Sequence, residues 1–275
     1  MTSIKGNVVV ITGAASGLGR ALAQEHAARG ARLALADVDE DGLQTTAASL
    51  PSSTRVTTHV VDVSNRERME HWARELHSAH GGVDILINNA GVAVRSDFEH
   101  LSYEQLERVI GVNLWGVIYG VKMLLPMLRI SPYAHIVNIA SVNSFVPLPQ
   151  NAAYNMAKSA VLGLTETLMQ ELAGSSIRVM SVHPGAIRTN LVRNSEGFTD
   201  AQVAYFDRFA KTTSEDAARA IADGIERNKD YLLIGRDAWL MALGRWLFPR
   251  RFVRMVGERN NQPTIAREPS SSSAL

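Results

Sequence analysis

Apolar, β-branched segments alternate along this chain with segments of amphipathic helical pattern, and this alternation restricts the possible folds more than any other feature. The segments expected to form strands are residues 8–11, 32–36, 55–61, 83–87, 135–139, 177–182 and 231–234. Because they are apolar throughout and separated by helical patterns, they predict parallel strands buried on both faces. Parallel strands connect by right-handed crossovers, so we expect an open, doubly wound α/β sheet of about seven strands with helices on both faces.

Helical patterns occupy the intervals between these segments. They are expected at residues 18–29, 41–49, 66–80 and 152–172, and after Ser102 and Ser214. Ser102 and Gln105 form a capping box, with Leu101 as its staple residue, and this motif predicts the start of a long helix.

The last third of the chain departs from the alternation. Residues 187–211 show no clean period, and we expect the stretch 188–213 to form an irregular lid over the substrate. A helical segment with apolar and basic residues is expected at 236–256, and a polar tail rich in Ser and Pro predicts disorder at 260–275. Residues 1–259 are expected to form a single domain, since α/β domains commonly reach about 250 residues.

Charge and cysteine content exclude several classes of function. The chain has 28 Lys and Arg against 27 Asp and Glu, so it lacks the basic surplus typical of a nucleic-acid-binding protein. Because it contains no cysteine, disulfides, thiolate catalysis and Cys-ligated metal sites are excluded. His77 and His80 could share a helix face, but no carboxylate motif accompanies them; a solvated face is favoured and no metal site is expected.

The sequence carries no pattern typical of export or membrane insertion. Its first residues contain only a four-residue apolar run, which is too short for a secretory signal. No uninterrupted stretch of about 20 apolar residues occurs, so no membrane-spanning helix is expected. These observations predict a soluble, cytoplasmic protein.

A glycine-rich turn follows the first predicted strand. Its residues are Thr12, Gly13, Ala14, Ala15, Ser16, Gly17, Leu18 and Gly19. Glycines allow positive φ angles and a close approach of backbone to ligand, and the helix N-terminus behind them favours a pyrophosphate. The position after a strand favours a Rossmann-like dinucleotide site, with a flexible loop of similar composition as the alternative.

Asp37 closes the second predicted strand, about 20 residues beyond the turn. A carboxylate there can accept hydrogen bonds from both ribose hydroxyls of adenosine, and it repels a 2′-phosphate. The acidic residues 39–41 add negative charge, so NAD is favoured over NADP as the cofactor. A solvated acidic loop is the alternative, and Arg20 or Arg32 would favour NADP if either reached the phosphate.

Tyr154 and Lys158 are four residues apart in a helical stretch, so they share one helix face and can point into one site. Ser141 lies just past the predicted strand 135–139. Ligands of open α/β sheets bind outside the carboxyl ends of the strands, so these groups are expected to converge beside the cofactor. Taken alone, the Tyr–Lys pair is typical of a helix surface and the serine of a turn or cap; their convergence favours catalysis.

Together these motifs resemble those of the short-chain dehydrogenase/reductase family, in its compact single-domain branch. The matching residues are the glycine-rich turn, Asn88-Asn89-Ala90-Gly91, Ser141, Tyr154-x-x-x-Lys158 and Pro184-Gly185. The resemblance covers about residues 5–235. It implies an NAD(H)-dependent oxidoreductase that interconverts a secondary alcohol and its ketone, active as a homodimer or homotetramer built on helices that begin near Ser102 and Ala152.

The resemblance implies a role for each catalytic residue. Tyr154 would be the general acid in carbonyl reduction and, as tyrosinate, the base in alcohol oxidation. Its pKa would then have to fall from about 10 to about 7, a change worth about 4 kcal/mol. Lys158 would favour the phenolate and bond to the nicotinamide ribose. Ser141 would donate to the substrate oxygen, and Asn113 would position a water on the proton path from Lys158.

The cofactor site would extend, by the same resemblance, over the turns that follow several strands. Its residues would be Gly13, Ser16, Gly17, Leu18, Gly19, Asp37, Asp62, Val63, Asn89, Ala90, Gly91, Tyr154, Lys158, Pro184, Gly185, Ile187 and Thr189. Asp62 and Val63 would contact adenine, and Thr189 would hold the carboxamide through its hydroxyl. Plainer interpretations stay open: Asp62 as a helix cap, and Asn113 as a polar group bonded inside a helix interface.

Two apolar regions bear on substrate and partners. Residues 145–149 and 92–94, with the aromatic residues of the lid, favour a small apolar alcohol or ketone, unless they belong to the core. The segment 239–254 interleaves Trp, Leu and Phe with arginines. Packing on a partner subunit or over the pocket is favoured there, and contact with a membrane surface is the alternative. The rival functions are NADP-dependent carbonyl reduction and a non-catalytic nucleotide-binding scaffold.

Overall fold

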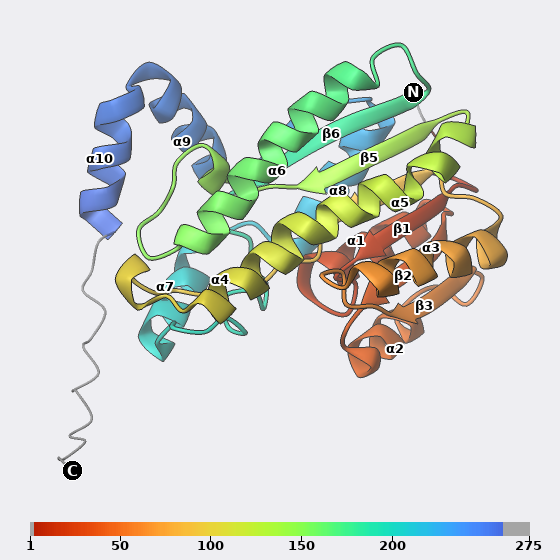
Figure 1. The fold of residues 1–275 in the computed structure, drawn as a ribbon, viewed down its shortest axis with the longest axis horizontal. Coiled ribbons are helices and arrows are strands. Elements are labelled where there is room, and N and C mark those ends of the chain that lie inside the picture. The colour runs from red at the N-terminus through yellow and green to blue at the C-terminus, as the bar shows by residue number, and fades with distance from the viewer. Residues whose placement is uncertain (1–2, 261–275) are drawn as a thin grey trace.

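Seven parallel strands form one sheet at the centre of the computed structural model, which describes residues 3–260 (Figure 1). The strands are β1 (Val8–Thr12), β2 (Arg32–Asp37), β3 (Val56–Val60), β4 (Ile85–Asn88), β5 (Ala134–Ile139), β6 (Ile177–Pro184) and β7 (Tyr231–Ile234). Their order is β3-β2-β1-β4-β5-β6-β7, and every neighbouring pair is parallel. The predicted doubly wound, Rossmann-like α/β fold is confirmed.

Helices cover both faces of this sheet (Figure 1). They are α1 (Gly17–Ala28), α2 (Glu40–Ala48), α3 (Arg66–His80), α4 (Tyr103–Ile110), α5 (Gly116–Ile130), α6 (Ala152–Glu171), α7 (Asp200–Phe209), α8 (Ser214–Glu226), α9 (Arg236–Leu247) and α10 (Pro249–Asn260). Helices α1, α2 and α8 pack on one face, and α3, α5 and α6 pack on the other. Short 3₁₀ turns, η1 (Phe98–His100) and η3 (Val142–Ser144), lie in the connections.

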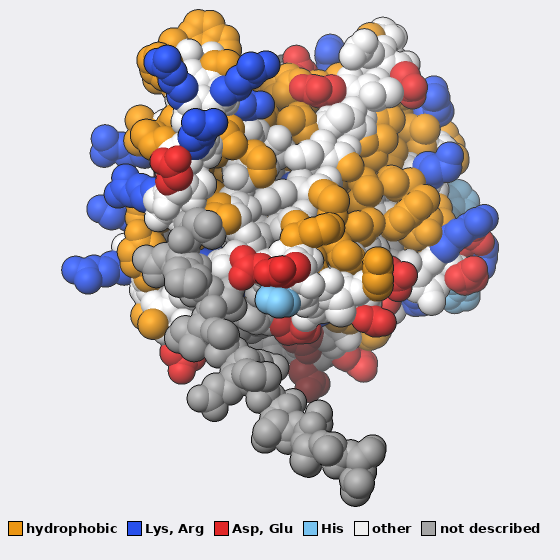
Figure 2. Space-filling model, turned by 60° about the vertical axis from the view of Figure 1, so that its left-hand side comes forward, with side chains coloured by type: hydrophobic (Ala, Val, Ile, Leu, Met, Phe, Trp, Pro, Cys, Tyr) orange, Lys and Arg blue, Asp and Glu red, His pale blue; other side chains and the backbone are white. Residues whose placement is uncertain are grey.

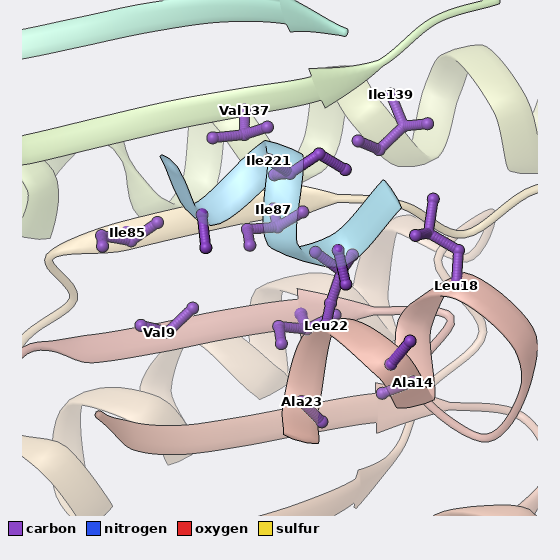
Figure 3. Close-up of a cluster of buried hydrophobic side chains, with 14 of the residues drawn as sticks. Val9, Ala14, Leu18, Leu22, Ala23, Ile85, Ile87, Val137, Ile139 and Ile221 are labelled. Atoms are coloured by element: carbon purple, nitrogen blue, oxygen red, sulfur yellow. The ribbon is translucent and has the colours of Figure 1, made fainter. Parts of the chain in front are cut away.

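Strand β1 illustrates why the strands are apolar throughout. Val9 and Ile11 point into the cluster that contains Leu22 of α1 and Ile221 of α8 (Figure 3). Val10, between them, belongs to the cluster on the opposite face. Because side chains alternate across a strand, a sheet covered on both faces needs apolar residues at every position.

The long helix predicted after Ser102 is interrupted by a π-helical turn, η2 (Gly111–Trp115), between α4 and α5. The capping box of Ser102 and Gln105 forms as expected. Asn113 of η2 is buried, and its amide bonds to both backbone groups of Val92 in the connection after β4. The partner of Asn113 is far away in the sequence, so local periodicity could not indicate this interruption.

The segment Tyr103–Ile130 has 28 residues, and an 18-residue window within it has a mean hydropathy of 1.5, so by length and composition alone it could span a membrane. It contains no 20-residue apolar run, which is why the sequence did not predict such a helix. In the structure Val121, Leu124 and Leu128 pack into the core cluster with Leu86 of the sheet. The segment therefore has the apolar face that a helix covering a sheet requires.

The connection from β6 to α8 contains a helix that the sequence did not predict. Residues 187–211 were expected to be irregular, but α7 forms within them, with Thr199 and Gln202 as its capping box. None of the residues of α7 is fully buried. Without a buried stripe the helix leaves no apolar period in the sequence, which explains why the prediction was wrong.

Helices α9 and α10 form a hairpin at the side of the molecule toward which the strands point (Figure 1). Phe252 of α10 packs against Gly244 of α9, where a Cβ would come within 2.3 Å of the ring. The predicted helical segment at 236–256 corresponds to these two helices. Of the tail predicted at 260–275, all but Asn260 lies outside the described residues.

Candidate active site

A cavity of about 430 Å³ lies at the carboxyl ends of the strands, in the size range of small-molecule sites. Its walls come from the turns after β1, β2, β3, β4, β5 and β6. The predicted residues that line it are Gly13, Ser16, Gly17, Leu18, Gly19, Asp37, Asp62, Val63, Asn89, Ala90, Gly91, Ser141, Tyr154, Lys158, Pro184, Gly185, Ile187 and Thr189. Of the predicted site residues only Asn113 is absent from its walls, as far as the described residues show.

The glycine-rich turn brings backbone to the cavity edge. Gly13 and Gly17 have φ angles of 68° and 50°, in the left-handed region that favours glycine. A Cβ on Gly19 would lie 1.9 Å from the carbonyl oxygen of Gly13, so only glycine allows α1 to begin this close to the turn.

The N-terminus of α1 is open to a ligand. Its N-cap residue, Ser16, makes no side-chain hydrogen bond to the helix. In contrast, α2, α3, α4, α7 and α8 are each capped by a side chain. The first N–H groups of α1 are therefore free of a side-chain cap, at the point where this helix borders the cavity.

Asp37 holds the turn after β2 in place at one end of the cavity. Its Oδ2 accepts a hydrogen bond from Ala15 N of the glycine-rich turn at 2.9 Å. Its Oδ1 accepts from the N–H groups of Val38 and Asp39. The carboxylate thus joins β2 to the glycine-rich turn while it lines the cavity.

Neither of the two arginines that could have favoured a 2′-phosphate lines the cavity, as far as the described residues show. Arg20 donates to the Thr46 hydroxyl and to the carbonyl of Ala15. Arg32 is at the start of β2, at the opposite end of the strand from Asp37, and donates to the carbonyl of Gly6. Within residues 3–260, Lys158 is the only basic residue in the cavity wall.

Asp62 and Asn89 are held by local contacts. Asp62 accepts from both the backbone N–H and the hydroxyl of Ser64, whereas the cap of α3 is Asn65, so the helix-cap interpretation of Asp62 is wrong. The Asn89 amide donates to the carbonyls of Thr12 and Gly13 and joins the end of β4 to the glycine-rich turn.

Ser141, Tyr154 and Lys158 converge on the opposite end of the cavity from Asp37. The Ser141 and Tyr154 side chains both line it, and Ser141 lies close enough to the phenol to favour its phenolate. Lys158 Nζ is buried, donates to the carbonyl of Ile139 at 2.7 Å, and lies 5.7 Å from the centroid of the Tyr154 ring. The helical spacing of four residues therefore brings the phenol and the ammonium together, as predicted.

Two sets of amide contacts hold helix α6 in this position, and the sequence analysis had missed them. The Asn143 amide, beside Ser141, donates to the Asn155 amide, beside Tyr154, at 3.0 Å. Farther along α6, Thr165 accepts from the amide of Asn138 in β5. These contacts fix the distance between the serine and the phenol, and no local motif marks them in the sequence.

Burial changes the pKa of both catalytic candidates. Loss of solvent raises the pKa of the Tyr154 phenol, and the hydrogen bond from Ser141 opposes this change in part. Burial also lowers the pKa of Lys158 to about 8. Within the chain itself, desolvation of the phenolate outweighs the contacts that favour it, and the lowered Tyr154 pKa expected beside a positively charged nicotinamide stays a prediction. At neutral pH the phenol is protonated and the lysine charged.

The connection after β6 closes the cavity on the side of α1. Thr189 packs against Gly17, where a Cβ would lie 3.3 Å from the Thr189 Cβ. Gly185 donates to the carbonyl of Ile234 in β7, and Ala186 N donates to the Asp237 carboxylate at the start of α9. The first residues of α9 thus help to hold the loop that borders the cavity.

The predicted apolar lining is only partly correct. Residues 145–149 do not line the cavity; Phe145 instead packs on His183 with ring centroids 4.3 Å apart. Val92 and Ala93 do line it. Residues that were not predicted individually also contribute, from the segment after β6: Asn190, Leu191, Val192, Asn194 and Ser195. Of the lid aromatics Phe198, Tyr205, Phe206 and Phe209, only Phe206 reaches the cavity, and Tyr205 and Phe209 stack on each other.

Comparison with known proteins agrees with this geometry. The family model of short chain dehydrogenases matches residues 7–199. The chain belongs to the short-chain dehydrogenase/reductase family. A relative in this family, the putative oxidoreductase SadH of Mycobacterium tuberculosis, is 39% identical over 246 residues, which cover 86% of this chain and 89% of SadH.

Solved structures of the family have the same fold. A short-chain dehydrogenase/reductase from Burkholderia phymatum, in complex with NAD, matches with a TM-score of 0.82 and 31% identity over 96% of this chain and 99% of its own. Levodione reductase matches with a TM-score of 0.79 and 28% identity over 86% of this chain and 98% of its own. This member of the family is therefore an oxidoreductase with a Rossmann-like fold.

Proposed function

We propose that this protein is an NAD(H)-dependent dehydrogenase that interconverts an apolar secondary alcohol and its ketone. The observation that carries the proposal is the convergence of Ser141, Tyr154 and buried Lys158 in one cavity that also reaches the glycine-rich turn. An alcohol dehydrogenase needs a group that moves the hydroxyl proton, and a site for the hydride carrier, in one enclosed space.

The residues of the cavity fit a dinucleotide. The uncapped N-terminus of α1 would hold the pyrophosphate, and Asp37 would hold the adenosine ribose. When bound, the nicotinamide would supply the hydride in reduction and accept it in oxidation. Asp37 and the absence of any Lys or Arg other than Lys158 from the described cavity wall support NAD over NADP.

Tyr154 moves the proton in the proposed reaction. In reduction its hydroxyl donates a proton to the substrate oxygen, and in oxidation its phenolate accepts the hydroxyl proton. Ser141 donates a hydrogen bond to the same oxygen while negative charge develops there. Charged Lys158 stabilises the phenolate that reduction leaves behind, and Asn113 supports the site by holding the backbone of Val92.

An apolar substrate is supported by the apolar part of the cavity wall. Its side chains include Val92, Ala93, Ile187, Leu191, Val192 and Phe206. Several of them belong to the segment 188–213, which we propose acts as the lid. A salt bridge from Arg108 and a hydrogen bond from Gln105, both of α4, hold Glu196 of this segment. We further propose a cytoplasmic homodimer or homotetramer built on α4, α5 and α6.

A panel of secondary alcohols and ketones, followed by NADH absorbance, tests the proposal. We expect turnover of apolar substrates with NAD(H), and kcat/KM with NADP(H) lower by about tenfold or more. Asp37→Asn is expected to reduce this preference, while Asp84→Asn, at the other end of the sheet, serves as the matched control. Turnover with NADP(H) alone would overturn the choice of cofactor. Cofactor binding without any turnover would favour the non-catalytic scaffold instead.

A further inference from the structure

The hairpin of α9 and α10, which we call the C-terminal arm, exposes an apolar face. Its exposed apolar side chains are Trp239, Leu240, Leu243, Trp246, Leu247, Phe248 and Met255. Trp239, Leu243 and Trp246 follow one another at intervals of four and three residues, so they share one side of α9. Trp246 has 78% of its surface exposed, although a tryptophan is normally among the most buried side chains.

The arm is also the most basic part of the chain. Residues 236–260 contain six arginines, Asp237 and Glu258, a net charge of +4. The whole chain has a net charge of only +1, so the remainder carries −3. None of these arginines forms an ion pair with a carboxylate of residues 3–260, and Asp237 is turned inward to the N–H of Ala186. Figure 2 shows this basic side of the molecule, with apolar side chains between the blue ones.

The charge indicates which kind of surface the arm fits. A symmetric contact of one arm with the arm of a second copy would place their arginines opposite one another, which like charges oppose. The cavity offers no place for the arm either, because its described lining contains no residue of α9 or α10. An anionic lipid surface fits both the positive charge and the exposed apolar side chains of the arm. The arginines meet negative headgroups, and the tryptophans enter the interface between headgroups and acyl chains.

We propose that the C-terminal arm docks this protein on the surface of an anionic lipid bilayer. The exposed side of α9 enters the interfacial layer, and Arg250, Arg251 and Arg254 on α10 contact phosphate groups of the lipids. The base of α9 contacts the connection after β6 through Asp237, and it packs near η3, which follows Ser141. Docking therefore places the same end of the sheet that carries the cavity toward the bilayer (Figure 1).

Vesicle sedimentation of the full chain tests this proposal directly. Vesicles of phosphatidylcholine alone are compared with vesicles that also contain phosphatidylglycerol, at low and at high salt. We expect the protein to sediment with the anionic vesicles only, and to be released by high salt because exposed charges are screened. The double variant Arg250→Glu/Arg254→Glu is expected to bind at least about 25-fold more weakly, since each basic residue near an anionic surface contributes about fivefold.

Matched controls separate docking from general charge and hydrophobicity. Arg74→Glu/Lys229→Glu changes the net charge equally at exposed sites outside the arm, and it should leave vesicle binding within about twofold. Trp246→Ser is expected to weaken binding about tenfold, whereas Ile130→Ser, with 82% of its surface exposed at the far end of α5, should not. Circular dichroism and NAD titration verify that each variant is folded.

Three results would overturn the proposal. The first is failure of the unaltered chain to sediment with anionic vesicles. The second is equal binding by the arm variants and their controls. The third is a change in molecular mass, measured by sedimentation velocity, when Trp239 and Trp246 are replaced while vesicle binding is unchanged, because that result would assign the arm to contact between copies of the chain.

Discussion

The cavity and the C-terminal arm depart from ordinary burial in opposite ways. In the cavity, Lys158 and Ser141 are polar side chains in the interior; on the arm, Trp239 and Trp246 are apolar side chains in solvent. Burying the Lys158 ammonium opposes folding, whereas an exposed apolar face changes folding little and favours contact with another surface. The comparison teaches that departures from ordinary burial mark the surfaces at which a protein acts. The kind of departure indicates the proposed chemistry: buried polar groups serve proton transfer in the cavity, and exposed apolar groups serve adhesion on the arm.

The largest expected effect is on turnover by the cavity. Tyr154→Phe removes the proton donor and is expected to reduce kcat by about 10³-fold, within the range typical of general acid–base catalysis. NAD affinity, measured by fluorescence titration, should change little. Tyr133→Phe is the control, because Tyr133 is an exposed phenol far from the cavity wall. Retained turnover in Tyr154→Phe would remove Tyr154 from the reaction.

Lys158→Met tests whether the buried charge opposes stability. We expect kcat to fall about 10²-fold, while the free energy of unfolding at pH 7 rises by about 1–2 kcal/mol because an ammonium is no longer desolvated. The pKa of Lys158 is lowered from 10.5 to about 8, so the unfolded chain binds the proton more tightly than the folded chain. The unaltered protein therefore gains stability as the pH rises from about 8 to about 10.5, and its difference from Lys158→Met narrows. Urea unfolding at pH 7 and pH 10 measures the free energy of unfolding of the unaltered protein and of Lys158→Met. A variant that is less stable than the unaltered protein at pH 7 would contradict this account.

The raised pKa of Tyr154 predicts opposite pH dependence for the two directions of the reaction. Reduction uses the protonated phenol and should be fastest near neutral pH. Oxidation uses the phenolate, so its kcat/KM should rise with pH by up to about tenfold per unit below that pKa. Rate profiles in both directions measure this difference. An oxidation rate that is highest below pH 7 would be incompatible with Tyr154 as the base.

The smallest effect is expected on the arm. Trp239→Ser/Trp246→Ser should change the free energy of unfolding by less than about 0.5 kcal/mol, because exposed side chains contribute little to folding. Trp72→Ala, which empties a fully buried site in the core, should cost about 3–5 kcal/mol. Thermal unfolding measures the loss in the free energy of unfolding for the arm variant and for Trp72→Ala. A cost above about 1 kcal/mol in the arm would mean that these tryptophans pack within the fold.

The sequence was most informative where the structure of a segment follows from the residue pattern within that same segment. The apolar runs predicted all seven strands, and the motifs after them predicted residues that do line one cavity. It failed at α7, which lacks a buried stripe, and at η2, which depends on the bond between Asn113 and Val92. It also assigned residues 145–149 to the substrate wall, whereas Phe145 packs on His183. In the failures at η2 and at residues 145–149, the deciding contact joins residues that are distant along the chain.

The amino-acid sequence by itself determined the parallel sheet, the backbone at the glycine-rich turn and the shared face of Tyr154 and Lys158, because periodicity and residue chemistry act over a few neighbouring positions. Only the tertiary structure decided the effect of burial on the Tyr154 pKa, the absence of Arg20 and Arg32 from the described cavity wall, and the exposure of the arm. Desolvation, distance between charges and accessible surface depend on what the whole chain brings around a residue, and no local pattern contains that information.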